Sequence, residues 1–105
     1  MPSSPADPEI VDVPDESRLV AVKDSTEAEL VYRVEDGRLV VVHTGVPEQL
    51  EGHGLGARLV RSALDKAERE QRTLVPLCPF ARRWLREHPD DARRVAVDWH
   101  LSQKR

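Results

Sequence analysis

Residues 51–57 read Glu-Gly-His-Gly-Leu-Gly-Ala, with glycines at positions 52, 54 and 56. Glycine permits a tight turn and leaves its backbone N–H group uncovered by a side chain. The stretch lies between a β-branched run that ends near His43 and an amphipathic segment that begins at about Leu55. Such amides, with the positive end of a following helix, form an anion site suited to a pyrophosphate. The turn therefore predicts phosphate binding; the alternative is a loop whose glycines only permit close packing.

Two common phosphate-binding motifs do not fit this turn. The dinucleotide fingerprint needs G-x-G-x-x-G in a βαβ unit, whereas the spacing here is G-x-G-x-G. The P-loop needs Gly-Lys-Ser or Gly-Lys-Thr, and no such sequence follows the glycines.

The segments before the turn predict an antiparallel meander. Residues 19–22, 28–34 and 39–42 are rich in β-branched side chains, as strands are. The pair Asp36-Gly37 joins the second run to the third and supports the positive φ angles of a tight hairpin turn.

The segments after the turn predict a helix, a strand and a second helix. Residues 73–77 suit a short strand, and Pro79 can open a helix that Pro89 ends. Residues 96–99 suit either a last strand or a packed tail. The order β-β-β-α-β-α predicts an α/β domain of the α+β type, with the fourth strand parallel to the third through a helical crossover. The buried face of the first helix is expected to carry Leu55, Leu59, Val60, Ala63, Leu64 and Ala67.

Length and charge limit the classes of protein. A chain of 105 residues suits one domain, and a formal net charge of −3 argues against a nucleic-acid binder. Residues 1–17 hold five acids, no basic residue and four prolines, which predicts a disordered tail and leaves residues 18–105 as the folded domain, with a formal charge of +2. Residues 9–13 form a short apolar patch that could dock on that domain.

Cellular setting and metal content follow from other absences in the sequence. The lone cysteine, Cys78, cannot form an internal disulfide, and no apolar run approaches the roughly 20 residues of a membrane span. The N-terminus lacks the features of a signal peptide, so we expect a cytoplasmic protein with no membrane partner. No two of the four histidines have metal-ligand spacing, so we expect no metal.

Over about residues 30–89 the chain resembles the minimal single-domain members of the GCN5-related N-acetyltransferase (GNAT) superfamily. Residues 32–34, the pair at 36–37, residues 43–60 and residues 76–80 carry the resemblance. The superfamily's acetyl-CoA signature, Gln/Arg-x-x-Gly-x-Gly/Ala, aligns with Glu51, Gly54 and Gly56. Glu51 departs from the signature, and a carboxylate suits a pyrophosphate site only if it points away.

The resemblance implies a small GNAT-like domain whose parallel central strands splay apart, at about residues 39–46 and 73–78, around acetyl-CoA. It implies an N-acetyltransferase in which an amine attacks the thioester directly; the alternative is a non-catalytic coenzyme A-binding or regulatory module. Backbone groups of Val41 and Val42 would bind the pantetheine arm. The pyrophosphate would bind the amides of Gly52, His53, Gly54, Leu55, Gly56 and Ala57.

Two residues are candidates for catalysis. His43 ends the third strand and has a pKa range that suits a general base; the alternative is a half-buried histidine that bonds a backbone group and fixes the strand end. Cys78 could protonate the leaving thiolate or accept the acetyl group, or be a small buried apolar residue. Short relatives often carry glutamate where Gly45 stands, so another group or water must then take the acceptor's proton. Tyr32, the single tyrosine, suits the core and not the site.

The acceptor side is expected to be open. The chain lacks the helical pair that superfamily members usually carry between their first two strands, which favours an exposed amine on a protein, or a polyamine. Arginines 58, 61, 82, 83 and 86 fit the 3′-phosphate of coenzyme A and a solvated helix face equally well. An exposed edge strand is compatible with a monomer or a weak homodimer.

Overall fold

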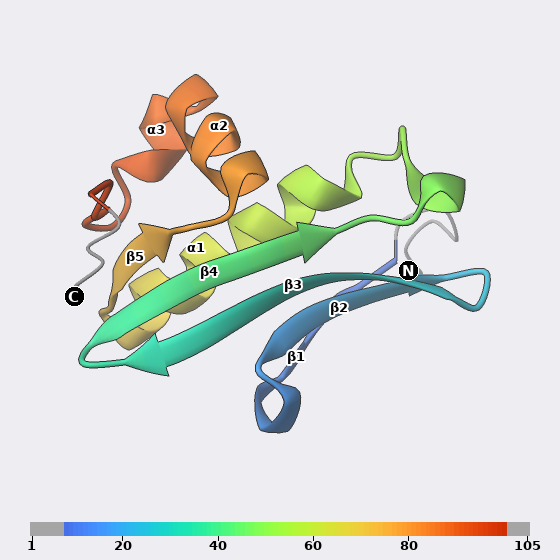
Figure 1. Ribbon diagram of the computed structural model, residues 1–105, viewed down its shortest axis with the longest axis horizontal. Coiled ribbons are helices and arrows are strands. Elements are labelled where there is room, and N and C mark those ends of the chain that lie inside the picture. The colour runs from blue at the N-terminus through green and yellow to red at the C-terminus, as the bar shows by residue number, and fades with distance from the viewer. Residues whose placement is uncertain (1–7, 101–105) are drawn as a thin grey trace, which may run out of the picture.

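The computed structural model describes residues 8–100, which form one five-stranded mixed sheet with three helices (Figure 1). The strands lie in chain order, and each is antiparallel to the one before it except the last, which is parallel to its neighbour. The predicted α+β class, meander and parallel strand are confirmed. The strands are β1 Ile10–Val13, β2 Arg18–Lys23, β3 Thr26–Glu35, β4 Arg38–Gly45 and β5 Thr73–Pro76.

Helix α1, Leu55–Glu70, lies across one face of the sheet and buries the core against it (Figure 1). Its predicted apolar residues are all buried. Helix α2, Pro79–Glu87, follows β5, and Pro89 opens a short α3, Pro89–Ala92, instead of only ending α2. No helix within residues 8–100 is long and apolar enough to cross a membrane. The strands of the core face contribute Leu19, Ala21, Ala28, Leu30, Tyr32, Leu39, Val41 and Leu74.

The prediction that residues 1–17 form a tail is wrong from Ile10 onward. Residues 10–13 are β1, which pairs along its whole length with β2, and Pro14–Glu16 form a turn of 3-10 helix. Asp12 accepts a hydrogen bond from the Tyr32 hydroxyl (2.6 Å) and one from Lys66 Nζ (2.8 Å). The apolar patch therefore docks on the domain, because a buried ammonium and a buried hydroxyl need its carboxylate. Residues 1–7 lie outside the described part of the chain.

The segment after α3 covers the outer edge of β5. The Leu74 N–H donates to the Ala96 carbonyl and the Asp98 N–H donates to the Leu74 carbonyl, both at 2.9 Å. Leu74 and Val97 form a single parallel bridge. Residues 96–99 were expected to form either a last strand or a packed tail. The packed tail is the better description, because a single bridge provides partners for the backbone groups of Leu74 and does not add a strand to the sheet.

Candidate active site

The two parallel strands separate halfway along β4. Their pairing runs from Arg38 and Thr73 to Val41 and Pro76 and ends there. The Val41 carbonyl then accepts hydrogen bonds from the amides of Leu77 (3.0 Å) and Cys78 (3.1 Å), as the chain turns toward α2. β4 continues to Gly45 beside β3 alone, with a bulge at its Val42. In the described part of the chain, β4 therefore has no strand partner on its β5 side beyond Val41.

The glycine turn faces this gap. Gly52 and Gly54 have φ angles of +87° and +72°. A residue with a side chain would adopt such an angle only at a conformational cost of about 1–2 kcal/mol. A Cβ added at either position would meet nothing within 4 Å. Gly54 precedes α1, and no side chain caps the first turn of the helix. The amides there keep their hydrogen-bonding capacity at the positive end of a 16-residue helix.

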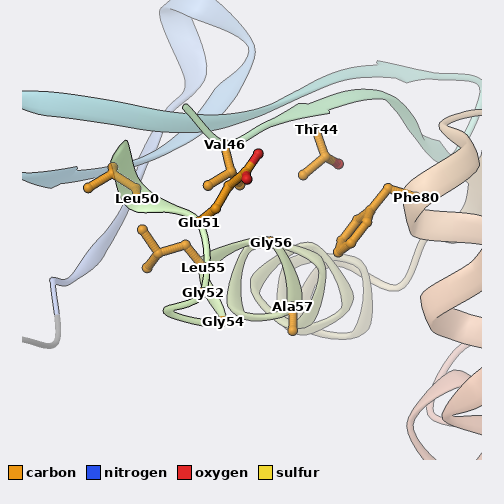
Figure 2. A pocket seen from close by; sticks show the side chains of 10 residues that line it. All are labelled: Thr44, Val46, Leu50, Glu51, Gly52, Gly54, Leu55, Gly56, Ala57 and Phe80. Atoms are coloured by element: carbon orange, nitrogen blue, oxygen red, sulfur yellow. The ribbon is translucent and has the colours of Figure 1, made fainter. Parts of the chain in front are cut away.

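The glycine turn and the gap beside β4 open into one cleft with a volume of about 410 Å³ (Figure 2). β4 and the residue after it contribute Thr44 and Val46, and α2 contributes Phe80. Glu51 also lines the cleft; its side chain extends toward Val46 and away from Gly54, so its carboxylate points away from the turn but stays at the cleft. The remaining lining residues are Leu50, Gly52, Gly54, Leu55, Gly56 and Ala57.

Gly56 serves a different purpose from the other two glycines. It lies inside α1, and a Cβ added to it would lie 2.8 Å from Cζ of Phe80. Real Cβ atoms do not approach this closely, so Phe80 takes its place in the cleft wall because residue 56 has no side chain. The glycine spacing thus combines two turn positions with one packing position.

Gly56→Ala is expected to separate stability from binding. The Phe80 ring must move out of the cleft wall, which we expect to weaken acetyl-CoA binding roughly tenfold. Alanine gains up to about 1 kcal/mol over glycine in a helix, so thermal stability should change little. Calorimetric titration and thermal unfolding measure the two effects. Phe80→Leu in the same chain makes room for the new methyl group, and a double variant that binds no better than Gly56→Ala would contradict the packing role.

Most of the predicted cofactor residues lie at the cleft, and some do not. Gly52, Gly54, Leu55, Gly56 and Ala57 line it, whereas His53 is exposed between the glycines. The Val41 oxygen is already occupied by two amides, and Val42 forms the bulge. The lining residues Thr44, Val46, Leu50 and Phe80 were not predicted. The free backbone of β4 on the β5 side begins after Val41, which moves the expected pantetheine contact toward residues 42–45.

The two catalytic candidates lie on different sides of β4. His43 is exposed, and its Nε2 lies 3.0 Å from where a Cβ of residue 45 would be, so the imidazole lies over Gly45. Thr44 faces the α1 side, because successive strand residues point to opposite faces. Cys78 is buried, with its Sγ 3.4 Å from Thr44 Oγ1, and it does not line the cleft. The structure brings Cys78 and Thr44 together and separates both from His43.

Most of the arginines considered for the 3′-phosphate contact aromatic rings. Arg61 lies over Trp84, Arg83 over Phe80, and Arg82 and Arg86 over Trp99. Arg82 also donates to the Trp99 carbonyl at 3.1 Å. Arg58 lies in the first turn of α1, beside the glycine turn. Within residues 8–100, no group of three or more His, Cys, Asp or Glu residues is arranged to hold a metal ion.

Strand order, splayed parallel pair and glycine turn together define a small GNAT-type domain. A family model described as "GCN5-related N-acetyl-transferase" matches residues 18–95, and the chain belongs to this family. It is an acetyltransferase domain, as the resemblance implied.

A solved structure shares the fold. The NMR structure of a "GCN5-like putative N-acetyltransferase" from Staphylococcus aureus matches with a TM-score of 0.67 and 24% identity, over 92% of this chain and 96% of that chain. At this identity the likeness establishes the fold alone. No curated protein matches the chain.

Proposed function

We propose that this domain transfers the acetyl group of acetyl-CoA to a cationic amine by direct attack of the neutral amine on the thioester. The observation that carries the proposal is that the glycine turn and the gap beyond Val41 open into the same cleft. The amides at the start of α1 suit the pyrophosphate. The free side of β4, residues 42–45, suits the pantetheine arm, and its amides can polarise the thioester carbonyl.

An acidic hollow supports a cationic acceptor. It has a volume of about 420 Å³, is lined by Glu27, Glu29, Gly45, Val46 and Pro47, and adjoins the cleft through Val46. Glu29 lies directly opposite Gly45 across the sheet, so its carboxylate lies beside the position where short relatives carry glutamate.

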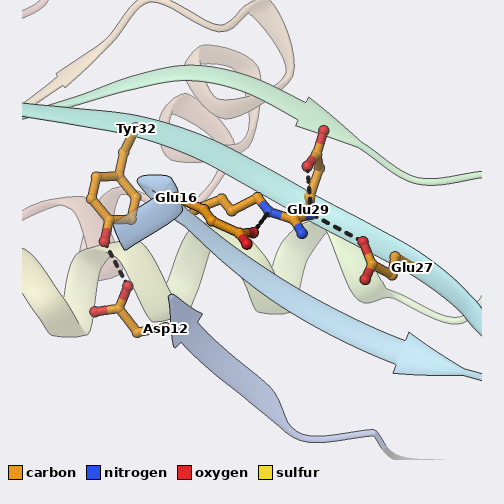
Figure 3. A network of polar contacts seen from close by, with 6 residues as sticks. Asp12, Glu16, Glu27, Glu29 and Tyr32 are labelled. Carbon is orange, nitrogen blue, oxygen red and sulfur yellow. Dashed lines mark hydrogen bonds and ion pairs between the residues drawn. The ribbon is translucent and has the colours of Figure 1, made fainter. Parts of the chain in front are cut away.

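The charge of this region stays negative despite an arginine. Arg18 bonds three carboxylates at 2.7–3.0 Å, those of Glu16, Glu27 and Glu29 (Figure 3). The two carboxylates that line the hollow, those of Glu27 and Glu29, exceed this one guanidinium by one negative charge, and Glu16 adds another outside the lining, so the region attracts a cation. An exposed lysine on a protein, or a polyamine, fits so open a surface better than a small enclosed substrate.

His43 suits the removal of the acceptor's proton. Its exposed imidazole lies over Gly45, at the border of the acidic hollow. The neutral nitrogen then attacks the carbonyl carbon, the C–N bond forms, the C–S bond breaks, and coenzyme A leaves as its thiol.

The proposal is tested in two steps. Calorimetric titration with acetyl-CoA comes first; then the protein is incubated with acetyl-CoA and either spermidine, a lysine-containing peptide or a small monoamine. Mass spectrometry of the products should show acetylated spermidine or peptide ahead of the monoamine. Faster acetylation of the monoamine would contradict the acceptor class, and a lack of acetyl-CoA binding would contradict the whole proposal.

The second candidate is a non-catalytic coenzyme A-binding module. The observation in its favour is that Tyr32, the one tyrosine of the chain, is buried and donates its hydroxyl to Asp12, away from the cleft. Many larger members of the superfamily use a tyrosine for the leaving group. Tight binding of acetyl-CoA without transfer to any of the three amines would favour this candidate.

Neutralising the acidic hollow is expected to weaken acceptor binding selectively. We expect Glu27→Gln and Glu29→Gln each to raise the KM for spermidine about fivefold. This change corresponds to the loss of about 1 kcal/mol of Coulombic attraction at the surface. The KM for acetyl-CoA should stay the same. Glu35→Gln, on the same strand but outside the hollow, is the matched control. Equal effects of all three variants would indicate net charge and not a site.

A further inference from the structure

The geometry points to Thr44 as the residue that protonates the departing coenzyme A thiolate, with Cys78 supplying the proton to Thr44 from behind. The inference rests on the proposed function and adds a catalytic residue to it. It starts from one contact that joins two segments far apart in the chain, Sγ of Cys78 to Oγ1 of Thr44 at 3.4 Å.

Thr44 is placed where the thioester sulfur is expected. It belongs to the part of β4 that has lost β5 as a neighbour, and its side chain lines the cleft between Val46 and Phe80 (Figure 2). The hydroxyl can accept one hydrogen bond and donate another at the same time. With the Cys78 thiol as its donor, Thr44 Oγ1 can direct its own hydrogen into the cleft.

Cys78 is placed to supply a proton through Thr44 and not to contact the substrate itself. Its exposed fraction is 3%, and it does not line the cleft. An acetyl group in the cleft would meet the Thr44 hydroxyl before the thiol, so transfer of the acetyl group to Cys78 would require Thr44 to move. The same separation suits a proton, which can cross from thiol to hydroxyl along one hydrogen bond.

The proton transfer balances. When the C–S bond breaks, the thiolate takes the hydroxyl proton of Thr44, and Thr44 Oγ1 takes the thiol proton of Cys78. The charge ends as a thiolate on Cys78, which precedes the first residue of the nine-residue helix α2, where negative charge is favoured. The acceptor nitrogen loses two protons in all: His43 passes the first to solvent before the attack, takes the second as the amide forms, and then releases that one to solvent as well. A proton from solvent restores Cys78 after coenzyme A leaves.

The experiment compares Thr44→Val, Thr44→Ser and Cys78→Ala with wild type, using acetyl-CoA with spermidine or the lysine peptide. Valine keeps the shape and removes the hydroxyl, and serine keeps the hydroxyl. We expect kcat to fall roughly 100-fold in Thr44→Val, a usual size for acid–base catalysis, and to stay within about threefold of wild type in Thr44→Ser. Cys78→Ala should be slowed by about tenfold, and adding it to Thr44→Val should slow the enzyme no further.

Two further measurements separate catalysis from packing. The dissociation constant for coenzyme A, from calorimetry, should stay within about threefold in Thr44→Val. With the acetyl thioester of 4-nitrothiophenol, whose thiolate needs no protonation to leave, the deficit of Thr44→Val in kcat/KM should shrink to less than about fivefold. A packing defect would slow both thioesters equally, and that result would overturn the inference.

Other outcomes also decide between the claims. A Thr44→Val variant with wild-type kcat overturns the role of Thr44. An acetylated Cys78 in the wild type, trapped by acid quench and found by mass spectrometry, overturns the relay in favour of a two-step transfer. A wild type that binds acetyl-CoA and releases no coenzyme A with either amine contradicts the proposed function itself, and the inference falls with it.

Discussion

Gly54→Glu is expected to raise the dissociation constant for acetyl-CoA by at least about 100-fold in calorimetric titration. The Cβ direction of Gly54 is open, so the new side chain can be accommodated without a clash. It places a carboxylate at the positive end of α1, where the pyrophosphate is proposed to bind. Two unit charges about 4 Å apart near a protein surface repel by about 4 kcal/mol, and a 100-fold loss needs only about 2.8 kcal/mol.

Gly54→Gln is the matched control for this prediction. Both variants force a side chain onto a φ angle of +72°, so both carry the same backbone strain of about 1–2 kcal/mol and should unfold at similar temperatures. The difference between their affinities then measures the charge alone. Equal losses in the two variants would show that the shape of the turn matters and that no phosphate lies beside residue 54.

Local signals allowed much of the fold to be predicted. Asp36 and Gly37 have φ angles of +51° and +73°, as the hairpin signature requires. Asp24 and Ser25 form the turn between β2 and β3, with φ angles of +54° and +67°. Because this pair contains no glycine, its sequence does not predict a hairpin turn as clearly as Asp36-Gly37 does. Strand β1 was missed because its surroundings are rich in proline and acid. Its anchor, Lys66, lies 54 residues away.

The site was predicted where it is local and missed where it is not. The glycine turn is a continuous stretch, and its positive φ angles follow from residue type. The reason for a glycine at position 56 is the ring of Phe80, from another helix. Thr44 and Cys78 are in contact although they lie 34 residues apart in the chain. The contact depends on where β4 and β5 separate, and that point is set by the register in which the two strands pair. No periodicity or motif encodes that point.

The largest effect on stability is expected at the anchor of β1. Lys66 is almost fully buried and bonds Asp12 at 2.8 Å and Glu70 at 3.0 Å. Burial and the Asp12 carboxylate raise the pKa of Tyr32 to about 12, so its hydroxyl remains a donor. Asp12→Ala removes the acceptor of the Tyr32 hydroxyl and one of the two carboxylates that bind the Lys66 ammonium. We expect a loss of about 2–3 kcal/mol in the free energy of unfolding, measured by urea denaturation at pH 7.

Asp15→Ala is the matched control, because it removes the same charge from an exposed position three residues further along the chain. Its effect should stay within about 0.5 kcal/mol. Equal effects of the two variants would show that charge, and not the buried contact, stabilises β1.

The same anchor predicts how the Asp12→Ala defect depends on pH. Burial by itself would raise the pKa of Asp12, but hydrogen bonds from Lys66 and Tyr32 outweigh it and hold the pKa below its usual value near 4. A carboxylate with a lowered pKa contributes stability above its unfolded pKa, and that contribution is lost as the pH falls through the folded pKa. The gap between wild type and Asp12→Ala should therefore be constant from pH 7 to about pH 5 and narrow below about pH 4. A gap that stays constant down to pH 2.5 would mean that Asp12 stabilises β1 by packing and not by its charge.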